Sequence, residues 1–502
     1  MNSFGSKLES NRVLQTSIDL TDLSADSTQT DSDHIVKASG FNVTATLDES
    51  RLEHERTSAN LISNEEYESN SDDEPIEYPD GGFRAYTVVF GSFLGMVACF
   101  GLFNSTGAIQ AYLNLHQLKG VSNSLSSIIF SVFTGCAYLV VILSGVLFDE
   151  YGSNTPVIIG SIFLFAGIFG AGNCTNVIQL TFVFGLLGGS GVAILSSPLT
   201  GVITHWFLKN RSKAFGLSTL GGSVGGMAFP VILEKLYRTV GYTSAMRIMA
   251  FICTTLSVLS CILVRERVKP ERLADSNLNR KQKIKQTGKE LVSLSKKSID
   301  FTALKEPRFL WCAVGASFGE LSLVCTLTYF ATYVTVVGFS EQTASTTLTV
   351  VNTMGIVGRY IGGALADKFG CFNIMMIMLS GMAACNLFLW CAWSTLSKDI
   401  ASIYVFAVFY GFFNSCVLSL SPSCVGSISP TRDFGKRYGT MYFISGVIIV
   451  SGVLGGGAII GHASLQNYRI FSLFCGLSSL LGVSCFAASR YTQVGMKLLV
   501  EI

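Results

Sequence analysis

Charged residues are scarce in this chain: they make up 14% of its 502 residues, whereas hydrophobic residues make up 49%. Soluble globular proteins carry about 25% charged residues. Most of the charges lie in the first 82 residues and in one central segment, 264–308, so the remainder is poorer in charge still. This composition excludes an ordinary soluble domain and favours a chain that lies mostly within a lipid bilayer.

The chain also lacks the residue patterns that support catalysis or cofactor binding. It has no Gly-rich phosphate loop, no metal-ligand cluster and no Ser-His-Asp arrangement, and none of its 14 cysteines forms a CxxC pair. Its five histidines lie in the N-terminal tail or at the ends of apolar segments, and the net charge of +2 provides no strong field for a polyanion. We therefore expect no enzymatic activity, no cofactor, no bound metal and no nucleic-acid partner.

Long apolar segments are what the sequence does contain. A membrane-spanning helix needs about 20 mostly apolar residues, and backbone groups in lipid must find their hydrogen bonds within the segment. The sequence therefore predicts an all-α membrane protein with twelve transmembrane helices. The predicted spans are 86–108, 124–148, 155–175, 179–206, 213–236, 243–263, 308–336, 343–366, 373–393, 400–426, 437–460 and 469–491.

Landmarks of the first six segments recur in the last six, in the same order and at offsets of 218 to 224 residues. Such a recurrence indicates a duplicated six-helix unit, and paired repeats are the usual architecture of secondary transporters. We therefore expect two pseudo-symmetric six-helix bundles. The recurring pairs are the octets Gly145–Gly152 and Gly363–Gly370, the Ser-Pro pairs at Ser197 and Ser421, Gly216 and Gly439, and Arg247 and Arg469.

The predicted domain boundaries follow the composition. Residues 1–82 form a Ser-rich, acidic tail that we expect to be disordered. The N-terminal bundle is predicted at 83–263, a basic loop at 264–306, the C-terminal bundle at 307–492 and a short tail at 493–502. Because cytosolic loops carry an excess of Lys and Arg, and Val264–Arg308 holds thirteen such residues against six acidic ones, both termini and the central loop are predicted to be cytosolic.

Both octets resemble the loop signature of the major facilitator superfamily, Gly-x-Leu-x-Asp-x-x-Gly. The C-terminal copy matches it better, because Ser153-Asn154-Thr155 follow the N-terminal copy where the family places basic residues. Their acidic residues, Asp149 and Asp367, are predicted to cap the next helix or to pair with a basic residue on a neighbouring one. Together with Lys213 and Lys436 they form the predicted cytosolic gate.

Two further stretches are similar to the monocarboxylate porter family of that superfamily. Pro79–Tyr86 resembles the Asp-Gly-Gly-aromatic start of its first helix, and Trp206–Ser223 resembles its fifth-helix signature, aromatic-Phe-x-Lys-x-Arg-x-x-Ala-x-Gly. The match is to the fungal monocarboxylate-transporter-like branch, which includes a riboflavin transporter, and it covers about residues 79–493. The resemblance implies an alternating-access transporter in the plasma membrane or the vacuolar membrane.

Two charged residues lie deep in apolar segments, where charge is expensive and usually functional. The resemblance implies that Arg359 binds a substrate carboxylate or takes part in coupling. Glu320 is a second candidate for substrate contact or for carrying a proton. A structural ion pair between the two residues is the alternative.

The chain departs from the proton-coupled animal members at two positions. Gly355 stands where they have Asp, and Asn104 stands nearest to their first-helix Lys, so their proton–lactate mechanism is not implied. A neutral site with aromatic residues suits a riboflavin-like ligand. The further candidates for such a site are Asn104, Asn352, Asn414 and Tyr329, with Phe103, Tyr333 and Tyr410 beside them.

The predicted function is secondary transport of a small organic solute, either a monocarboxylate-like anion or a riboflavin-like compound. The partners are therefore the solute and the lipid bilayer, and the sequence leaves the oligomeric state open. A solute sensor built on a transporter fold is the alternative, because the coupling residues of the animal members are missing and an acidic tail is present.

Overall fold

The computed structural model describes residues 77–121, 123–268, 299–461 and 464–495, and these residues are helical with short connections and no strand. Most of the predicted N-terminal tail, the greater part of the predicted central loop and most of the C-terminal tail lie outside the described residues.

The first half of the chain forms one series of helices. The fifth and sixth predicted spans are joined in α9, whose only non-helical residue is Gly241, with φ 77° and ψ 170°. This half comprises α2 (Gly82–Asn104), α3 (Thr106–Leu115), α4 (Asn123–Leu139), α5 (Val141–Tyr151), α6 (Asn154–Ala171), α7 (Val177–Leu180), the π-helix η1 (Thr181–Gly188), α8 (Gly189–Thr204) and α9 (Arg211–Leu263).

The second half follows the same plan after a short helix, α11 (Phe301–Lys305). Its long helices are α12 (Pro307–Val337), α13 (Glu341–Phe369), α14 (Cys371–Ala384), which continues through the π-helix η3 (Cys385–Ser394) into α15 (Thr395–Ser397), then α16 (Ile400–Ser427), α17 (Phe434–Ile460) and α18 (Leu465–Val494), with the 3-10 turn η4 (Thr431–Asp433) before α17.

These helices account for twelve membrane spans. Among the described residues, ten helices are long and apolar enough to cross a membrane. One of them, α9, is 53 residues long and contains two spans that meet at Gly241. The twelfth span is α13, whose 29 residues are long enough but include five Thr, one Ser and one Gln. The predicted all-α, twelve-helix fold class is confirmed.

Local sequence signals explain where several of these helices begin and end. Ser340, Asp399 and Ser464 each accept a hydrogen bond at a helix N-terminus, from the backbone N–H three residues later. Such side-chain caps satisfy amide groups that have no partner within the helix. At the end of α12, Gly338 adopts φ 114°, which glycine takes without steric cost.

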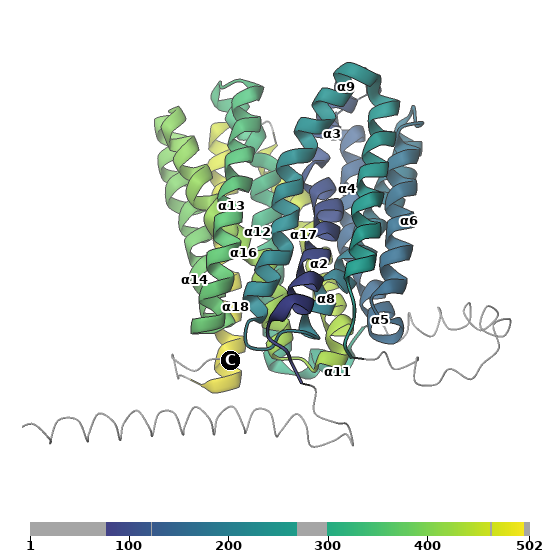
Figure 1. Cartoon of the computed structure of the whole chain (residues 1–502). Helices are drawn as coiled ribbons and strands as arrows, with labels where there is room; N and C mark the ends of the chain where they lie inside the picture. The colour runs from purple at the N-terminus through teal and green to yellow at the C-terminus, as the bar shows by residue number, and fades with distance from the viewer. Residues whose placement is uncertain (1–76, 122, 269–298, 462–463, 496–502) are drawn as a thin grey trace, which may run out of the picture. The chain divides into compact units, whose positions relative to one another are not determined.

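The two halves pack on one another with approximate two-fold symmetry. Helix α9 of the first half packs against α13 of the second, and α17 of the second half packs against α5 and α4 of the first. The long helices run side by side, and α2 begins at the same end at which α18 terminates, the lower end in Figure 1. We call this the terminal end of the bundles.

Candidate solute-binding site

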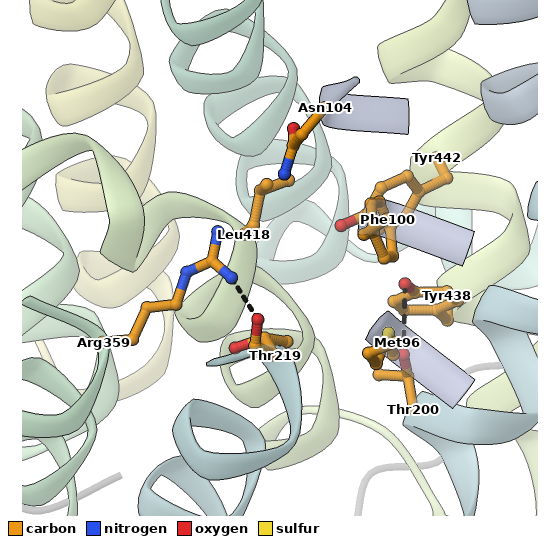
Figure 2. Close-up of a pocket in the computed structure, with 9 residues that line it drawn as sticks. All are labelled: Met96, Phe100, Asn104, Thr200, Thr219, Arg359, Leu418, Tyr438 and Tyr442. Carbon is orange, nitrogen blue, oxygen red and sulfur yellow. Dashed lines mark hydrogen bonds between the residues drawn. The ribbon is translucent and has the colours of Figure 1, made fainter. Parts of the chain in front are cut away.

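A small central cavity lies between the two bundles, and six helices contribute to its wall (Figure 2). In this conformation it has room for about one water molecule. Apolar and aromatic side chains form most of the wall: Met96 and Phe100 from α2, Leu418 from α16, and Tyr438 and Tyr442 from α17. Four polar side chains complete it: Asn104, Thr200, Thr219 and Arg359.

Arg359 is the charged residue of this cavity. Its side chain is buried, its Nε donates to the carbonyl oxygen of Ser415 at 3.3 Å, and its Nη1 donates to the carbonyl oxygen of Thr219. Ser415 belongs to α16 of the same bundle and Thr219 to α9 of the other, so the guanidinium bridges the bundles. No carboxylate among the described residues forms an ion pair with it. Arg359 therefore keeps a positive charge that a solute group with lone pairs can satisfy.

Asn104 lies at the end of α2, above Arg359 in the view of Figure 2, whereas Tyr438 and Tyr442 lie on the side opposite Arg359. Its Nδ2 donates to the carbonyl oxygen of Gly222 at 3.0 Å. Two glycines of α9 make room for side chains of α2 at the cavity. A Cβ at Gly226 would lie 2.8 Å from the Cβ of Asn104, and a Cβ at Gly222 would lie 2.9 Å from the Cβ of Phe100. The glycine run of α9 thus permits close helix approach at the cavity.

The structure brings two of the six predicted site residues to the cavity, Asn104 and Arg359. Glu320 is fully buried in α12 next to it and interacts with Tyr442 of the cavity wall. Neither Glu320 oxygen has a hydrogen-bond partner of normal geometry, and no ion pair joins Glu320 to Arg359.

The other three predicted residues lie away from the cavity wall. Tyr329 donates to the carbonyl oxygen of Val453 at 3.2 Å. Asn414 is buried in α16 and interacts with Tyr410, and Asn352 is half-buried on α13. Their roles in binding stay predictions.

Sequence reasoning missed most of the cavity wall. Tyr438 and Tyr442 are four residues apart and therefore share one face of α17. That spacing, directly after the recurring basic residues Lys436 and Arg437, was a usable signal. Thr200 and Thr219 gave a weaker signal, because a threonine in an apolar helix usually bonds to its own backbone, as Thr200 does to Ser196 at 2.8 Å.

At the terminal end, each octet aspartate caps a helix of the opposite bundle. Asp149 of α5 accepts from the backbone N–H groups of Gly435 (2.9 Å) and Lys436 (2.7 Å), in the first turn of α17. Asp367 of α13 accepts from those of Ser212 (2.7 Å) and Lys213 (2.9 Å), in the first turn of α9. A carboxylate at a helix N-terminus gains hydrogen bonds and a favourable interaction with the helix dipole.

The predicted capping thus joins the two bundles, and not successive helices of one bundle. The lysine side chains play a smaller part than their backbone amides: the Nζ of Lys436 lies 3.8 Å from Asp300, in its own half of the chain. Where the N-terminal octet lacks basic residues after its second glycine, Ser153 donates instead to Glu266, from its backbone N–H at 2.5 Å and from its hydroxyl at 2.7 Å.

The two stretches that resemble the monocarboxylate porters contact each other at Asp80. Its carboxylate accepts from three consecutive backbone N–H groups, those of Leu208 (2.7 Å), Lys209 (2.7 Å) and Asn210 (3.2 Å). Its own N–H donates to the carbonyl oxygen of Trp206 at 3.1 Å. The segment before α2 therefore holds the loop that leads into α9, the helix that Asp367 caps.

The family follows from comparison with known proteins. A family model described as the Major Facilitator Superfamily matches residues 90–450. The chain belongs to the major facilitator superfamily. The chain is 36% identical over 450 residues to the riboflavin transporter MCH5 of Saccharomyces cerevisiae, a match that covers 88% of this chain and 84% of that one. It is 28% identical over 430 residues to the MFS transporter asaE of Aspergillus flavus, covering 86% and 92% of the two chains.

Solved structures of facilitators share the fold. The proton:xylose symporter XylE bound to 6-bromo-6-deoxy-D-glucose aligns with a TM-score of 0.62 and 14% identity, over 83% of this chain and 98% of that one. The human organic anion transporter MFSD10 aligns with a TM-score of 0.57 and 14% identity, over 81% and 99%. Both likenesses support two six-helix bundles.

This facilitator is a multi-pass membrane protein and a secondary transporter of a small organic solute. The predictions of transporter function and of no enzymatic activity are confirmed by the family, and the sensor alternative finds no support in it. The narrower assignment to the monocarboxylate porters stays a prediction.

Proposed function

We propose that this facilitator carries a planar heterocyclic solute of the riboflavin type by alternating access. The observation that carries the proposal is a buried Arg359 that forms no ion pair with a carboxylate of the described residues, in a cavity walled by Phe100, Tyr438 and Tyr442. Aromatic rings stack on planar ring systems, and a guanidinium donates to ring carbonyl oxygens. The similarity to a riboflavin transporter over 88% of the chain supports the same solute class.

Each polar group of the cavity has a role in this proposal. Arg359 binds the carbonyl oxygens of the solute, and Asn104 offers amide donors and an acceptor to its remaining polar edge. Thr200 and Thr219 supply hydroxyl groups for a polyhydroxy side chain. Because the cavity is narrow here, α2 and α17 must separate for the solute to enter, as alternating access requires.

The proposed orientation places the terminal end in the cytosol. The loops and first helical turns at this end carry Lys209, Arg211, Arg432, Lys436 and Arg437, and the cytosolic side of a membrane protein carries the excess of such residues. On this orientation the inter-bundle caps of Asp149 and Asp367 close the cytosolic side, and they act as the gate. The tail at 1–82 and the loop at 264–306 are then cytosolic, and the membrane is the plasma membrane or the vacuolar membrane.

A monocarboxylate-like anion is the second candidate solute, because a buried Arg359 that pairs with no carboxylate in the described part of the chain also suits a solute carboxylate. Purified full-length protein in proteoliposomes distinguishes the two. We expect saturable uptake of riboflavin that excess lactate does not inhibit. Uptake of lactate with no uptake of riboflavin would assign the second candidate, and uptake of neither solute would refute both.

A further inference from the structure

A hollow on the exposed face of α9 lies outside the solute cavity. Its volume is about 390 Å³, and five residues of the second span of α9 line it: Ile248, Phe251, Ile252, Thr255 and Leu256. Four of these side chains are apolar, and the hydroxyl of Thr255 donates to the backbone carbonyl oxygen of Phe251 at 2.8 Å. Because the hollow lies within a membrane span, its surroundings are lipid acyl chains.

Arg247 lies at one end of the hollow, directly before Ile248 and one turn before Phe251. Its guanidinium lies over the ring of Phe169 on α6, 5.4 Å from the ring centroid. Phe169 also contacts Phe251 edge-on, with ring centroids 6.3 Å apart. The Nη2 of Arg247 donates to the Oδ1 of Asn173, just after α6, at 2.7 Å. These contacts hold the charged group against the edge of the apolar hollow.

The position of Arg247 along α9 places it near the lipid head groups. The two spans of α9 meet at Gly241, at the end of the bundles opposite the terminal end (Figure 1). Arg247 follows Gly241 by six residues, which corresponds to about 9 Å along a helix. Arg469 occupies the recurring position in the other half, near the start of α18. Arginine side chains near the end of a membrane span extend toward the phosphate groups of the lipids.

The guanidinium of Arg247 has donors that a phosphate can use. Its side chain is exposed, and the neutral amide of Asn173 accepts from one of its nitrogen atoms. No aspartate or glutamate of the described residues forms an ion pair with it. A guanidinium donates strong, often paired hydrogen bonds to phosphate oxygens. The ligand that fits both parts of this surface has an anionic phosphate joined to a long apolar chain.

We propose that Arg247 and the hollow form a binding site for one phospholipid of the leaflet opposite the terminal end. The phosphate accepts hydrogen bonds from the guanidinium of Arg247, and one acyl chain lies in the hollow against Phe251 and Ile252. Because Arg247 also holds Asn173, the bound lipid connects α9 with the end of α6. The site is separate from the central cavity and does not depend on which solute the protein carries.

Native mass spectrometry of the purified full-length protein tests the site. Phosphatidylglycerol is the probe, and diacylglycerol with the same acyl chains is the comparison lipid that lacks the phosphate. Arg247→Gln removes the charge, and Thr255→Trp fills the hollow; both side chains are exposed, so neither change disturbs the packed core. Arg469→Gln is the matched control, because it removes the exposed arginine at the corresponding position of the other half.

We expect the wild-type protein and Arg469→Gln to bind one phosphatidylglycerol with equal affinity, and more tightly than diacylglycerol. We expect Arg247→Gln to bind it about fivefold more weakly, and Thr255→Trp to show a similar loss. Equal affinity in all four proteins would mean that only the general lipid shell is bound, and would overturn the inference.

Three further results would also overturn the inference. Diacylglycerol that binds the wild-type protein as tightly as phosphatidylglycerol would remove the role of the phosphate. A loss in Arg469→Gln equal to that in Arg247→Gln would show that any arginine at this depth is enough. A dimer that Thr255→Trp dissociates would show that a second copy of the chain, and not a lipid, covers the hollow.

Discussion

At the scale of single residues, the two buried charges of the C-terminal bundle do not neutralise each other. Sequence reasoning placed Arg359 and Glu320 deep in apolar helices and left open whether they form a structural ion pair. In the structure the guanidinium of Arg359 donates to two backbone carbonyl oxygens, and the carboxyl group of Glu320 lies near tyrosine side chains. Depth in the membrane follows from position in the segment, whereas the partner of a side chain depends on helix rotation and crossing, which hydropathy does not encode.

Replacing Arg359 with alanine removes the charged donor of the cavity. Hydrogen bonds to charged groups contribute about 1.5–3 kcal/mol, so we expect riboflavin uptake to fall by about 10- to 100-fold. The measurement is the initial uptake rate, normalised to the amount of folded protein in the membrane. The exposed Arg238, whose side chain pairs with Glu234 at 2.6 Å, provides the matched Arg238→Ala control. Normal uptake by the Arg359→Ala protein would refute the assignment.

At the scale of whole helices, α13 shows that a sequence predicts the existence and bounds of a helix but not the face that it presents to its neighbours. Its length predicts a span correctly, although it is too polar to qualify by hydropathy alone. The half of α13 that lies away from the terminal end exposes polar residues at helical spacing, including Gln342, Thr346, Thr349 and Thr353. The periodicity of a helix thus predicts its existence and approximate bounds. Which face of the helix meets the cavity depends on packing with α9 and α16. The sequence therefore predicts how deep Asn352 and Asn414 lie in the membrane, but not whether their side chains reach the cavity.

The two inter-bundle caps form a matched pair of elements. A carboxylate at a helix N-terminus contributes about 0.3–1 kcal/mol, and up to about 2 kcal/mol where it is partly buried. We expect Asp149→Asn and Asp367→Asn each to shift the equilibrium by about fivefold toward the conformation that is open at the terminal end, and the double variant to shift it further. Spin labels at the exposed residues Lys209 and Lys368, attached through unnatural amino acids, report the separation of the bundles at this end.

The control for the caps is Asp399→Asn, because Asp399 caps α16 within its own bundle by accepting from Ser402 at 2.7 Å. This variant removes an equivalent charge without touching the interface between the bundles. Label separations that stay at the wild-type value in the double variant of Asp149 and Asp367 would show that the caps do not hold the terminal end closed.

At the scale of the whole molecule, the residues that recur in both halves and the residues that occur in only one half lie in different places. Each octet aspartate caps a helix of the opposite bundle, so the two octets make equivalent contacts. The repeat is visible in the sequence alone, and it therefore also predicts this symmetric pair of contacts. Asn104, Glu320 and Arg359 have no counterparts in the other half, and they lie in or beside the central cavity. We therefore propose that the symmetric contacts serve the movement of the bundles and that the asymmetric residues determine which solute is carried.

Closure of the terminal end requires contact between backbones, and Gly145 provides the sharpest test of it. A Cβ at Gly145 would lie 2.6 Å from the carbonyl carbon of Gly435 and 3.3 Å from the backbone nitrogen of Lys436, so no side chain can move aside to accommodate it. Alanine raises helix propensity by up to about 1 kcal/mol over glycine, so a folding defect is not expected.

We expect Gly145→Ala to hold the bundles apart at the terminal end and to stop net uptake. Gly455 in α17 has no atom within 4 Å of its Cβ position, and Gly455→Ala serves as the control. A Gly145→Ala protein that closes normally, with wild-type label separations and uptake, would show that the close approach of α5 and α17 is not part of the transport cycle.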